Sequence, residues 1–306
     1  MNANWIPEFR RARVQGLIAS GAGLGGAISP LLFTWLIVQY GWQFSFVASA
    51  AFTAALALLW FWYVKDHPLE SLPTQTTASD STEQTSQPVA HSGPRSTPWK
   101  RLLTNPNLML LTAGYFAVCY FEYIFFYWMF YYFGQVRQVG SQQTAWFTTI
   151  LFLAWMVMTP FGGYLSDRLV DRYGPRLGRQ LVPMVGLSLS ALFLFVGINC
   201  SSTIATVTLL ALALGLASCS DGPFWAAAIE IADRRDVGLA SGILNTGGNL
   251  GGFLAPLLTP FIASYAGWSW GLYFGSFVSL GGLFTWLFFD PSQTLREAST
   301  NLEPAT

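Results

Sequence analysis

The sequence predicts an all-α membrane protein with eight transmembrane helices. Of its 306 residues, 53% are hydrophobic and only 10% are charged, whereas a soluble domain carries about 25% charged residues. Eight apolar stretches each reach the roughly 20 residues that a helix needs to cross a hydrocarbon core about 30 Å thick. The basic residues also gather in every second loop and at both ends of the chain, as expected for an even number of crossings.

The eight stretches are bounded by charged residues or by Gly, Pro and Asn turns. They lie at about 12–39, 44–64, 107–133, 143–165, 181–199, 203–229, 238–264 and 268–289. Basic residues near span ends remain on the cytoplasmic side, and only Arg137 of the 15 Lys and Arg falls in the opposite set of loops. Because losing one span would scramble this alternation, we expect both termini in the cytoplasm.

Composition argues against several classes of protein. The 15 basic and 15 acidic residues cancel, so no overall charge attracts nucleic acid. Cys119, Cys200 and Cys219 lie inside apolar stretches, where we expect small buried side chains and no disulfide framework. The only histidines, His67 and His91, border or occupy a polar segment, and no thiol pair has metal-ligand spacing. We therefore expect no metal site and no membrane metalloenzyme.

An internal repeat relates the first stretch to the seventh. Residues 16–42 and 242–268 share ten identities in 27 positions at a constant offset of 226 residues. The matching runs read GLIASGAGLGGAISPLL and GILNTGGNLGGFLAPLL, and each is followed by a Gly-Trp pair. Repeats of this kind build transporter halves around a central site.

A polar segment separates the halves unequally, with two stretches before it and six after it. Residues 69–96 are rich in Ser, Thr, Gln and Pro, which cannot bury a core, so we expect a flexible cytoplasmic linker. The repeat makes the seventh stretch the fifth helix of its half, so about four helices are expected upstream of Met1. The predicted organisation is the last two helices of a first half at 1–66, the linker at 67–105, a six-helix half at 106–290 and a cytoplasmic tail at 291–306.

These features resemble the major facilitator superfamily, whose fold is two six-helix halves joined by a cytoplasmic linker. The loop GGYLSDRLVDRYGPRLGR is similar to the family's G-x-x-x-D-R signature between its eighth and ninth helices, with Gly163, Asp167 and Arg168 in the matching places. The next arginine of the signature is either Arg176 or Arg179. The resemblance implies that the eight stretches correspond to helices 5–12 of a twelve-helix plan.

Three shorter runs resemble the anion:cation symporter branch of that family. They read NANWIPEFRRARVQG near the start, DGPFWAAAIEIA at 221–232 and SGILNTGGNLGG at 241–252. The resemblance implies secondary active transport of a small organic anion such as a sugar acid, by symport with protons or sodium and alternating access. It also implies no other cofactor, no enzymatic activity, a bacterial inner (plasma) membrane and a monomer when full length.

Glu122 lies near the middle of the stretch at 107–133, on one helical face with Tyr115 and Cys119. An ionisable group inside a bilayer costs several kcal/mol, on the order of 3 or more, so it is a functional candidate by default. We expect Glu122 to carry a proton coupled to substrate and Tyr115 to help line the binding site. The alternative is a carboxylic acid satisfied by tyrosine hydroxyls in the helix packing.

Asp221 stands beside Gly222 and Pro223, and a proline can open a helix around a binding cavity. Trp225 follows one turn later and could stack on a sugar-like substrate. We therefore include Asp221 and Trp225 among the substrate-binding candidates. The alternative is an acid that caps the kink or pairs within its own half.

Asn245 and Asn249 are four residues apart and share one helical face. The equivalent repeat positions hold Ala19 and Gly23, so tight packing explains the shared glycines but not the asparagines. Their amides can bind hydroxyl and carboxylate groups of a substrate, with interhelical hydrogen bonding as the alternative.

Charged residues gather at the cytoplasmic ends of the second half. The resemblance implies that Asp167, Arg168, Arg176 and Glu230 form a gating cluster that holds the inward side shut, against the alternative of solvated helix ends. No Arg or Lys lies centrally in a visible span to bind a substrate carboxylate. A transport-inactive truncated protein, acting as a scaffold or remnant, is thus the alternative to a carrier, and no motif points to an intramembrane enzyme.

Overall fold

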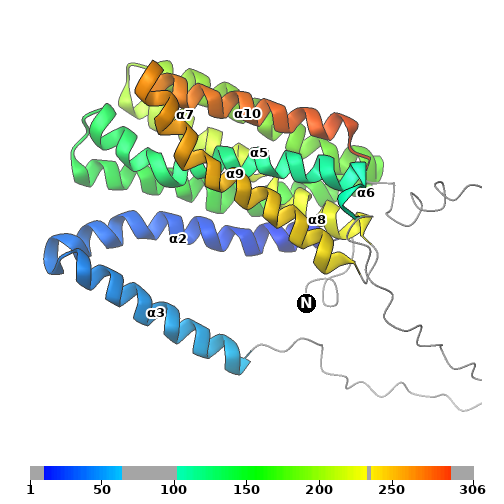
Figure 1. The fold of residues 1–306 in the computed structure, drawn as a ribbon, viewed down its shortest axis with the longest axis horizontal. Helices are drawn as coiled ribbons and strands as arrows, with labels where there is room; N and C mark the ends of the chain where they lie inside the picture. Colours follow the sequence, from blue (N-terminus) through cyan, green and yellow to red (C-terminus); the bar gives the residue numbers. More distant parts are fainter. Residues whose placement is uncertain (1–9, 64–101, 233–235, 291–306) are drawn as a thin grey trace, which may run out of the picture.

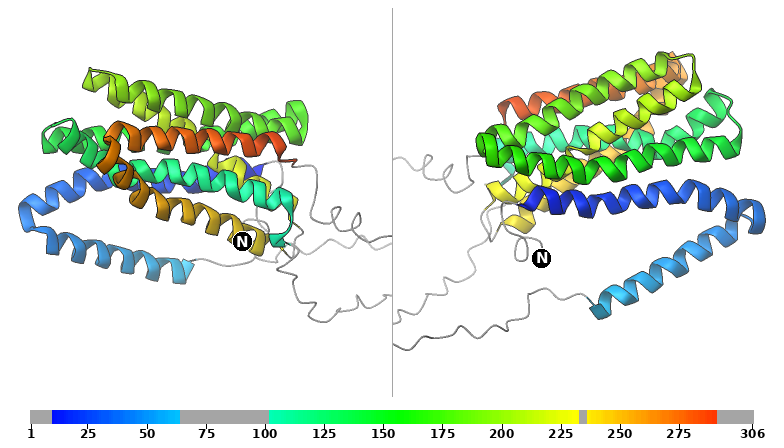
Figure 2. Two further views of the ribbon diagram at one scale, coloured as in Figure 1. Left: turned by 45° about the horizontal axis from the view of Figure 1, so that its top comes forward. Right: turned by 180° about the vertical axis from the view of Figure 1, so that it is seen from behind.

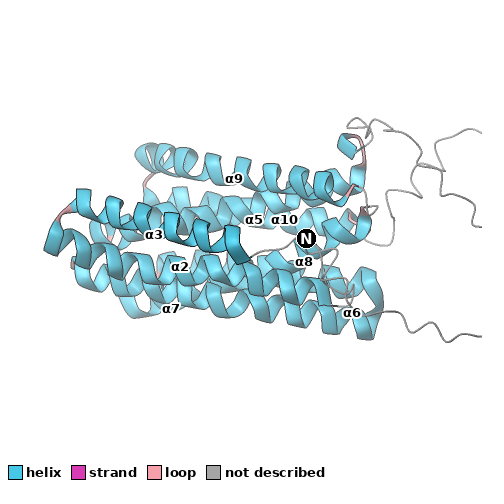
Figure 3. Ribbon diagram, turned by 90° about the horizontal axis from the view of Figure 1, so that it is seen from below, coloured by secondary structure: helices cyan, strands magenta, loops and turns pink. Residues whose placement is uncertain are grey.

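The structure, a computed structural model, describes residues 10–63, 102–232 and 236–290 (Figure 1). Within these ranges the chain is helical, with short turns and no strand (Figure 3). The helices are α2 (Arg11–Tyr40), α3 (Trp42–Tyr63), α5 (Pro106–Tyr131), the π-helix η2 (Tyr132–Val136), α6 (Ser141–Asn199), α7 (Thr203–Ser218), α8 (Asp221–Ile231), α9 (Val237–Ala266) and α10 (Trp268–Phe288). The predicted all-α fold is confirmed, and helix covers most of each of the eight expected ranges.

Six helical stretches in the described part of the chain are long and apolar enough to cross a membrane. They are Arg11–Tyr40, Trp42–Tyr63, Pro106–Val136, Ser141–Asn199, Thr203–Ile231 and Trp268–Phe288. Helix α9 is not among them, and α6 counts once although it contains two of the expected spans. The count of eight crossings therefore stays a prediction. The expected linker at 67–105 and tail at 291–306 lie mostly or wholly outside the described residues.

Helix α6 consists of two segments that meet at Gly174, whose φ of 83° and ψ of 170° are not helical. A left-handed φ favours glycine because it lacks a Cβ atom, and the following Pro175 is suited to a new first turn. The two segments then run back along each other (Figure 2). This turn places Asp167 and Arg179 on opposite sides of a tight corner.

Glycines allow the backbone of α2 to pack directly against the backbone of α6. A Cβ atom on Gly16 would be 2.7 Å from the carbonyl oxygen of Thr159, and one on Gly23 would be 2.7 Å from the backbone nitrogen of Met156. Helix α3 packs on α2 near their common turn and otherwise stands apart from the bundle (Figures 1 and 2). Helix α2 is thus the part of the expected first half that contacts the second half.

Candidate functional site

A cluster of polar and aromatic side chains lies inside the bundle where α5, α6 and α8 meet. We call it the carboxyl cluster, and its members are Tyr115, Cys119 and Glu122 of α5, Trp155 of α6, and Asp221 and Trp225 of α8. The four residues of this set that the sequence singled out for substrate binding, Tyr115, Glu122, Asp221 and Trp225, are brought together.

The start of α8 explains how Asp221 enters this cluster. The expected helix at 203–229 is interrupted at Cys219 and Ser220, so Asp221 occupies the first turn of a new helix. A carboxylate is favourable there because it faces the positive end of the helix dipole. Pro223 also lies in this first turn, where its missing N–H removes no helical hydrogen bond. The break therefore comes just before Asp221 rather than after Pro223.

Glu122 and Asp221 form the buried centre of the cluster. Each is only 4% exposed, and their carboxyl groups are close enough to interact electrostatically. Trp155 donates its indole N–H to Oδ2 of Asp221 over 3.4 Å. Among the described residues, Oε1 of Glu122 and Oδ1 of Asp221 receive no hydrogen bond. Two adjacent carboxylates repel each other, and one shared proton removes that repulsion.

Aromatic contacts fix one side of the same cluster. The indole N–H of Trp225 donates to the hydroxyl of Tyr115 over 3.0 Å, and the two rings meet edge to face with centroids 5.9 Å apart. The ring of Phe224 lies 5.5 Å from that of Tyr115. Tyr115 is thereby held near the two acids as a buried side chain.

The structure does not bring the two asparagines into these contacts. Asn245 and Asn249 are exposed, and the amide of Asn249 donates to the backbone carbonyl of Asn245 over 2.8 Å. Gly248, between them, packs on the cluster instead, since a Cβ atom there would be 2.7 Å from the Tyr115 ring and 2.9 Å from Cys119 Sγ. The asparagines therefore flank the face of α9 that contacts the cluster.

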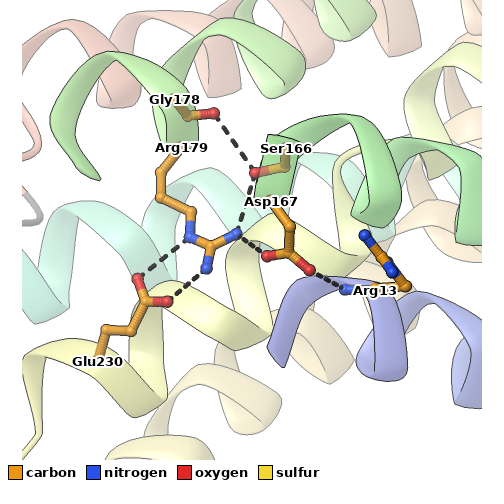
Figure 4. A network of polar contacts seen from close by, with 6 residues as sticks. All are labelled: Arg13, Ser166, Asp167, Gly178, Arg179 and Glu230. Atoms are coloured by element: carbon orange, nitrogen blue, oxygen red, sulfur yellow. Dashed lines mark hydrogen bonds and ion pairs between the residues drawn. The ribbon is translucent and has the colours of Figure 1, made fainter. Parts of the chain in front are cut away.

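A second group of charges lies at the arginine-rich end of the helices (Figure 4). Arg179, only 1% exposed, donates to Oδ1 of Asp167 over 2.6 Å and to Oε1 and Oε2 of Glu230 over 2.5 and 3.1 Å. It also donates to Ser166 over 3.2 Å. We call Asp167, Arg179 and Glu230 the arginine network. Two acids and one cation are paired almost out of water, which is favourable only with such complete hydrogen bonding.

Asp167 also bonds to the other half of the molecule. Its Oδ2 accepts a hydrogen bond of 2.9 Å from the backbone N–H of Arg13, in the first turn of α2. The guanidinium of Arg13 lies over the ring of Tyr164, 4.6 Å from its centroid, and Figure 4 draws Arg13 on the far side of Asp167 from Arg179. The network therefore joins α2, α6 and α8.

Two arginines expected in the gating cluster lie outside this network. Arg168 is exposed and donates to the hydroxyl of Tyr164 over 2.6 Å, while Arg176 is 60% exposed and lies 3.8 Å from Asp290. Arg179, the second alternative for the signature arginine, is the one between Asp167 and Glu230. The reason is the corner at Gly174, since it folds the chain so that Gly178 and Arg179 face Ser166 and Asp167.

Sequence reasoning did not single out Trp155, which bonds to Asp221. A tryptophan in an apolar stretch does not by itself indicate a functional site. Only the structure shows that the indole N–H of Trp155 points to Asp221. Among the described residues no group of three or more His, Cys, Asp or Glu side chains is arranged to hold a metal ion.

Comparison with known proteins places these features in a family. The profile of the Major Facilitator Superfamily matches residues 1–175 and 168–304, nearly the whole chain. A probable sulfoacetate transporter of Cupriavidus necator is 29% identical over 302 residues, covering 95% of this chain and 67% of that protein. A hexuronate transporter of Bacillus subtilis is 28% identical over 284 residues, covering 92% and 64%.

A D-galactonate transporter of Escherichia coli is 27% identical over 302 residues, covering 94% of this chain and 68% of that protein. The chain spans between about half and two thirds of the length of the curated relatives that it matches. What those relatives do as whole proteins is thus a starting point for a proposal about this chain.

Proposed function

The chain belongs to the major facilitator superfamily, a family of non-enzymatic membrane transporters, and on that premise we propose that it moves a small organic anion of the sugar-acid class. The mechanism we propose is symport with protons or sodium, with alternating access. The relatives support an organic anion, because they are named for sulfoacetate, hexuronate and galactonate. We place this integral membrane protein in a bacterial inner membrane with both termini cytoplasmic.

The observation that carries this proposal is the buried pair formed by Glu122 and Asp221. Burying an ionisable acid inside a membrane protein is costly. Such acids are therefore rare, and they commonly mark ion and proton pathways. Two adjacent carboxyl groups bind one proton readily, because the state in which both are ionised is unfavourable. A proton taken up from one side and released to the other would couple the pair to substrate movement.

The arginine network supplies the proposed closure on the cytoplasmic side. It ties α2 to α6 and α8 through Asp167, whose carboxylate contacts both Arg13 and Arg179. If the two halves rock apart, the bond between Arg13 and Asp167 breaks first, because it alone in the network crosses between halves. We thus propose that the network stabilises the state that is closed toward the cytoplasm.

For substrate contact we propose Tyr115 and Trp225 on the cluster side and the exposed amides of Asn245 and Asn249 on α9. Hydroxyl and amide groups can bind the hydroxyls of a sugar acid. Asn249 uses only one of its polar groups in its bond to Asn245, so its carbonyl oxygen remains available. The aromatic faces of Tyr115 and Trp225 offer apolar contact for a sugar ring.

Uptake of labelled hexuronate, aldonate or aldarate by cells that express the 306-residue chain tests this proposal. We expect saturable uptake that depends on a proton or sodium gradient, and reduced uptake in Glu122→Gln and Asn249→Ala. If both variants transport normally with unchanged pH dependence, the site is wrongly assigned. If the folded and inserted chain transports none of these acids, a transport-inactive protein is the better description.

A further inference from the structure

A cationic cavity of about 610 Å³ lies between α2 and α6 at their arginine-rich end, outside both groups described above. It is lined by Arg13, Tyr164, Arg168, Asp171 and Arg172. Three guanidinium groups and one carboxylate leave this small space with a net charge of +2. The sequence predicts that this end of the helices faces the cytoplasm.

Tyr164 arranges two of these cations. The guanidinium of Arg13 lies over its ring, 4.6 Å from the centroid, and Arg168 donates to its hydroxyl over 2.6 Å. The guanidinium of Arg172 lies over the ring of Tyr173, 5.4 Å from the centroid. Within the described residues none of the three guanidinium groups forms an ion pair, so each keeps donors for an anion.

Exposed apolar side chains continue from this cavity along both helices. On α6, Tyr164 and Arg168 share a face with Phe161 and Val157, which are 50% and 58% exposed. On α2, Leu17 follows Arg13 by one turn and is 64% exposed. Positive charge at the interface above an apolar stripe is the arrangement that matches a phospholipid, with its headgroup on the arginines and its acyl chains on the stripe.

We propose that this cavity binds the phosphate of an anionic phospholipid, such as phosphatidylglycerol, from the cytoplasmic leaflet. Arginine suits this ligand because its planar fork of donors binds two phosphate oxygens at once. The lipid would contact α2 through Arg13 and α6 through Arg168 and Arg172. It would thus bridge the same two helices that Asp167 connects, but on the membrane side.

The test measures phosphatidylglycerol bound to the intact chain in phosphatidylcholine nanodiscs with graded phosphatidylglycerol content, using native mass spectrometry. One basic residue near an anionic membrane surface contributes about a fivefold change in binding. We therefore expect Arg168→Gln and Arg172→Gln each to weaken retention about fivefold. Asp171→Asn removes a repulsive charge and is expected to strengthen retention by a similar factor, about fivefold.

Arg176→Gln is the matched control, because Arg176 lies on the same side but pairs with Asp290 outside the cavity. We expect it to retain phosphatidylglycerol like the unaltered chain. Equal losses in Arg168→Gln and Arg176→Gln would overturn the proposal, since the effect would then be general surface charge. Displacement of the lipid by millimolar soluble glycerol phosphate would also overturn it, because the site would then bind a free anion. The opposite effect of Asp171→Asn separates charge from misfolding.

Discussion

The backbone N–H of Arg13 donates a hydrogen bond of 2.9 Å to Oδ2 of Asp167, a residue 154 positions further along the chain. The first N–H groups of a helix have no partner within the helix, and a carboxylate both satisfies one of them and faces the positive end of the dipole. Asp167 thereby caps α2 from α6, while its other oxygen accepts from Arg179.

We expect Asp167→Ala to release the start of α2. The Arg13 amide then loses its acceptor, so peptides that cover residues 11–16 should exchange hydrogen for deuterium faster than in the unaltered chain. Hydrogen–deuterium exchange with mass spectrometry measures this directly. Arg176→Gln, at the same end of the helices but outside the network and the cavity, should leave the exchange of these peptides unchanged. Equal acceleration in both variants would contradict the cap.

Removal of Arg179 should be costly, because it leaves Asp167 and Glu230 without their shared cation. Breaking a buried pair by removing one partner destabilises a protein by about 3–5 kcal/mol. Arg176→Gln should change stability by less than about 1 kcal/mol, since its contact with Asp290 is long and exposed. Thermal unfolding of Arg179→Gln and Arg176→Gln in the same nanodiscs compares them, and similar melting temperatures would disprove the structural role of Arg179.

The contrast between these arginines shows where sequence reasoning succeeded. Asp167 and Glu230 could be chosen because charges at span ends and a recognised signature marked them. The arginine that joins them could not, because Arg168, Arg176 and Arg179 all lie within one short loop. The non-helical conformation of Gly174 reverses the chain, and this turn determines that Arg179 faces Asp167 and Glu230.

The carboxyl cluster could likewise be predicted only in part from the sequence. Glu122 and Asp221 could be predicted separately, because an acid in an apolar stretch is conspicuous. Their closeness could not, since it depends on the crossing of α5 with α8 and on the break at Cys219. The spacing of Asn245 and Asn249 predicts one shared face, and the comparison with Ala19 and Gly23 marks both asparagines as unexplained by packing. Neither observation says which helix that face meets.

Glu122 and Asp221 should act as a unit in proton coupling. If they share one proton, Glu122→Gln and Asp221→Asn each remove the site, so each should reduce gradient-driven uptake by about tenfold or more. The double variant should be little worse than either single variant, because residues that act together are not additive. Asp236→Asn controls for the loss of an acid outside the cluster, because the Asp236 side chain makes no capping hydrogen bond to α9.

Uptake of a labelled sugar acid, measured with and without an imposed pH gradient, distinguishes the outcomes. Fully multiplicative losses in the double variant would mean that the two acids work independently. Retained dependence on the gradient in both single variants would place the proton elsewhere. Binding of substrate without a gradient should survive in the variants, because their amides keep the shape of the site.

Two glycines at matching repeat positions give the sharpest comparison of packing. Gly25 and Gly251 occupy the same place in the two repeats, yet a Cβ atom on Gly251 would overlap the carbonyl oxygen of Phe116, whereas one on Gly25 would meet nothing within 4 Å. The sequence cannot distinguish them, because their neighbours within the repeat are nearly the same. The difference lies in α5, which packs closely against α9.

In the 306-residue chain we therefore expect the same substitution to have opposite effects. Gly251→Ala forces α9 away from α5 and should destabilise the protein by about 1–3 kcal/mol, the usual cost of overpacking. Gly25→Ala restricts the unfolded chain without a clash and should be neutral or stabilising by up to about 1 kcal/mol. Thermal unfolding of both variants under identical conditions measures the difference. Equal destabilisation would contradict this difference, because Gly25 would then have to pack against another helix as closely as Gly251 does.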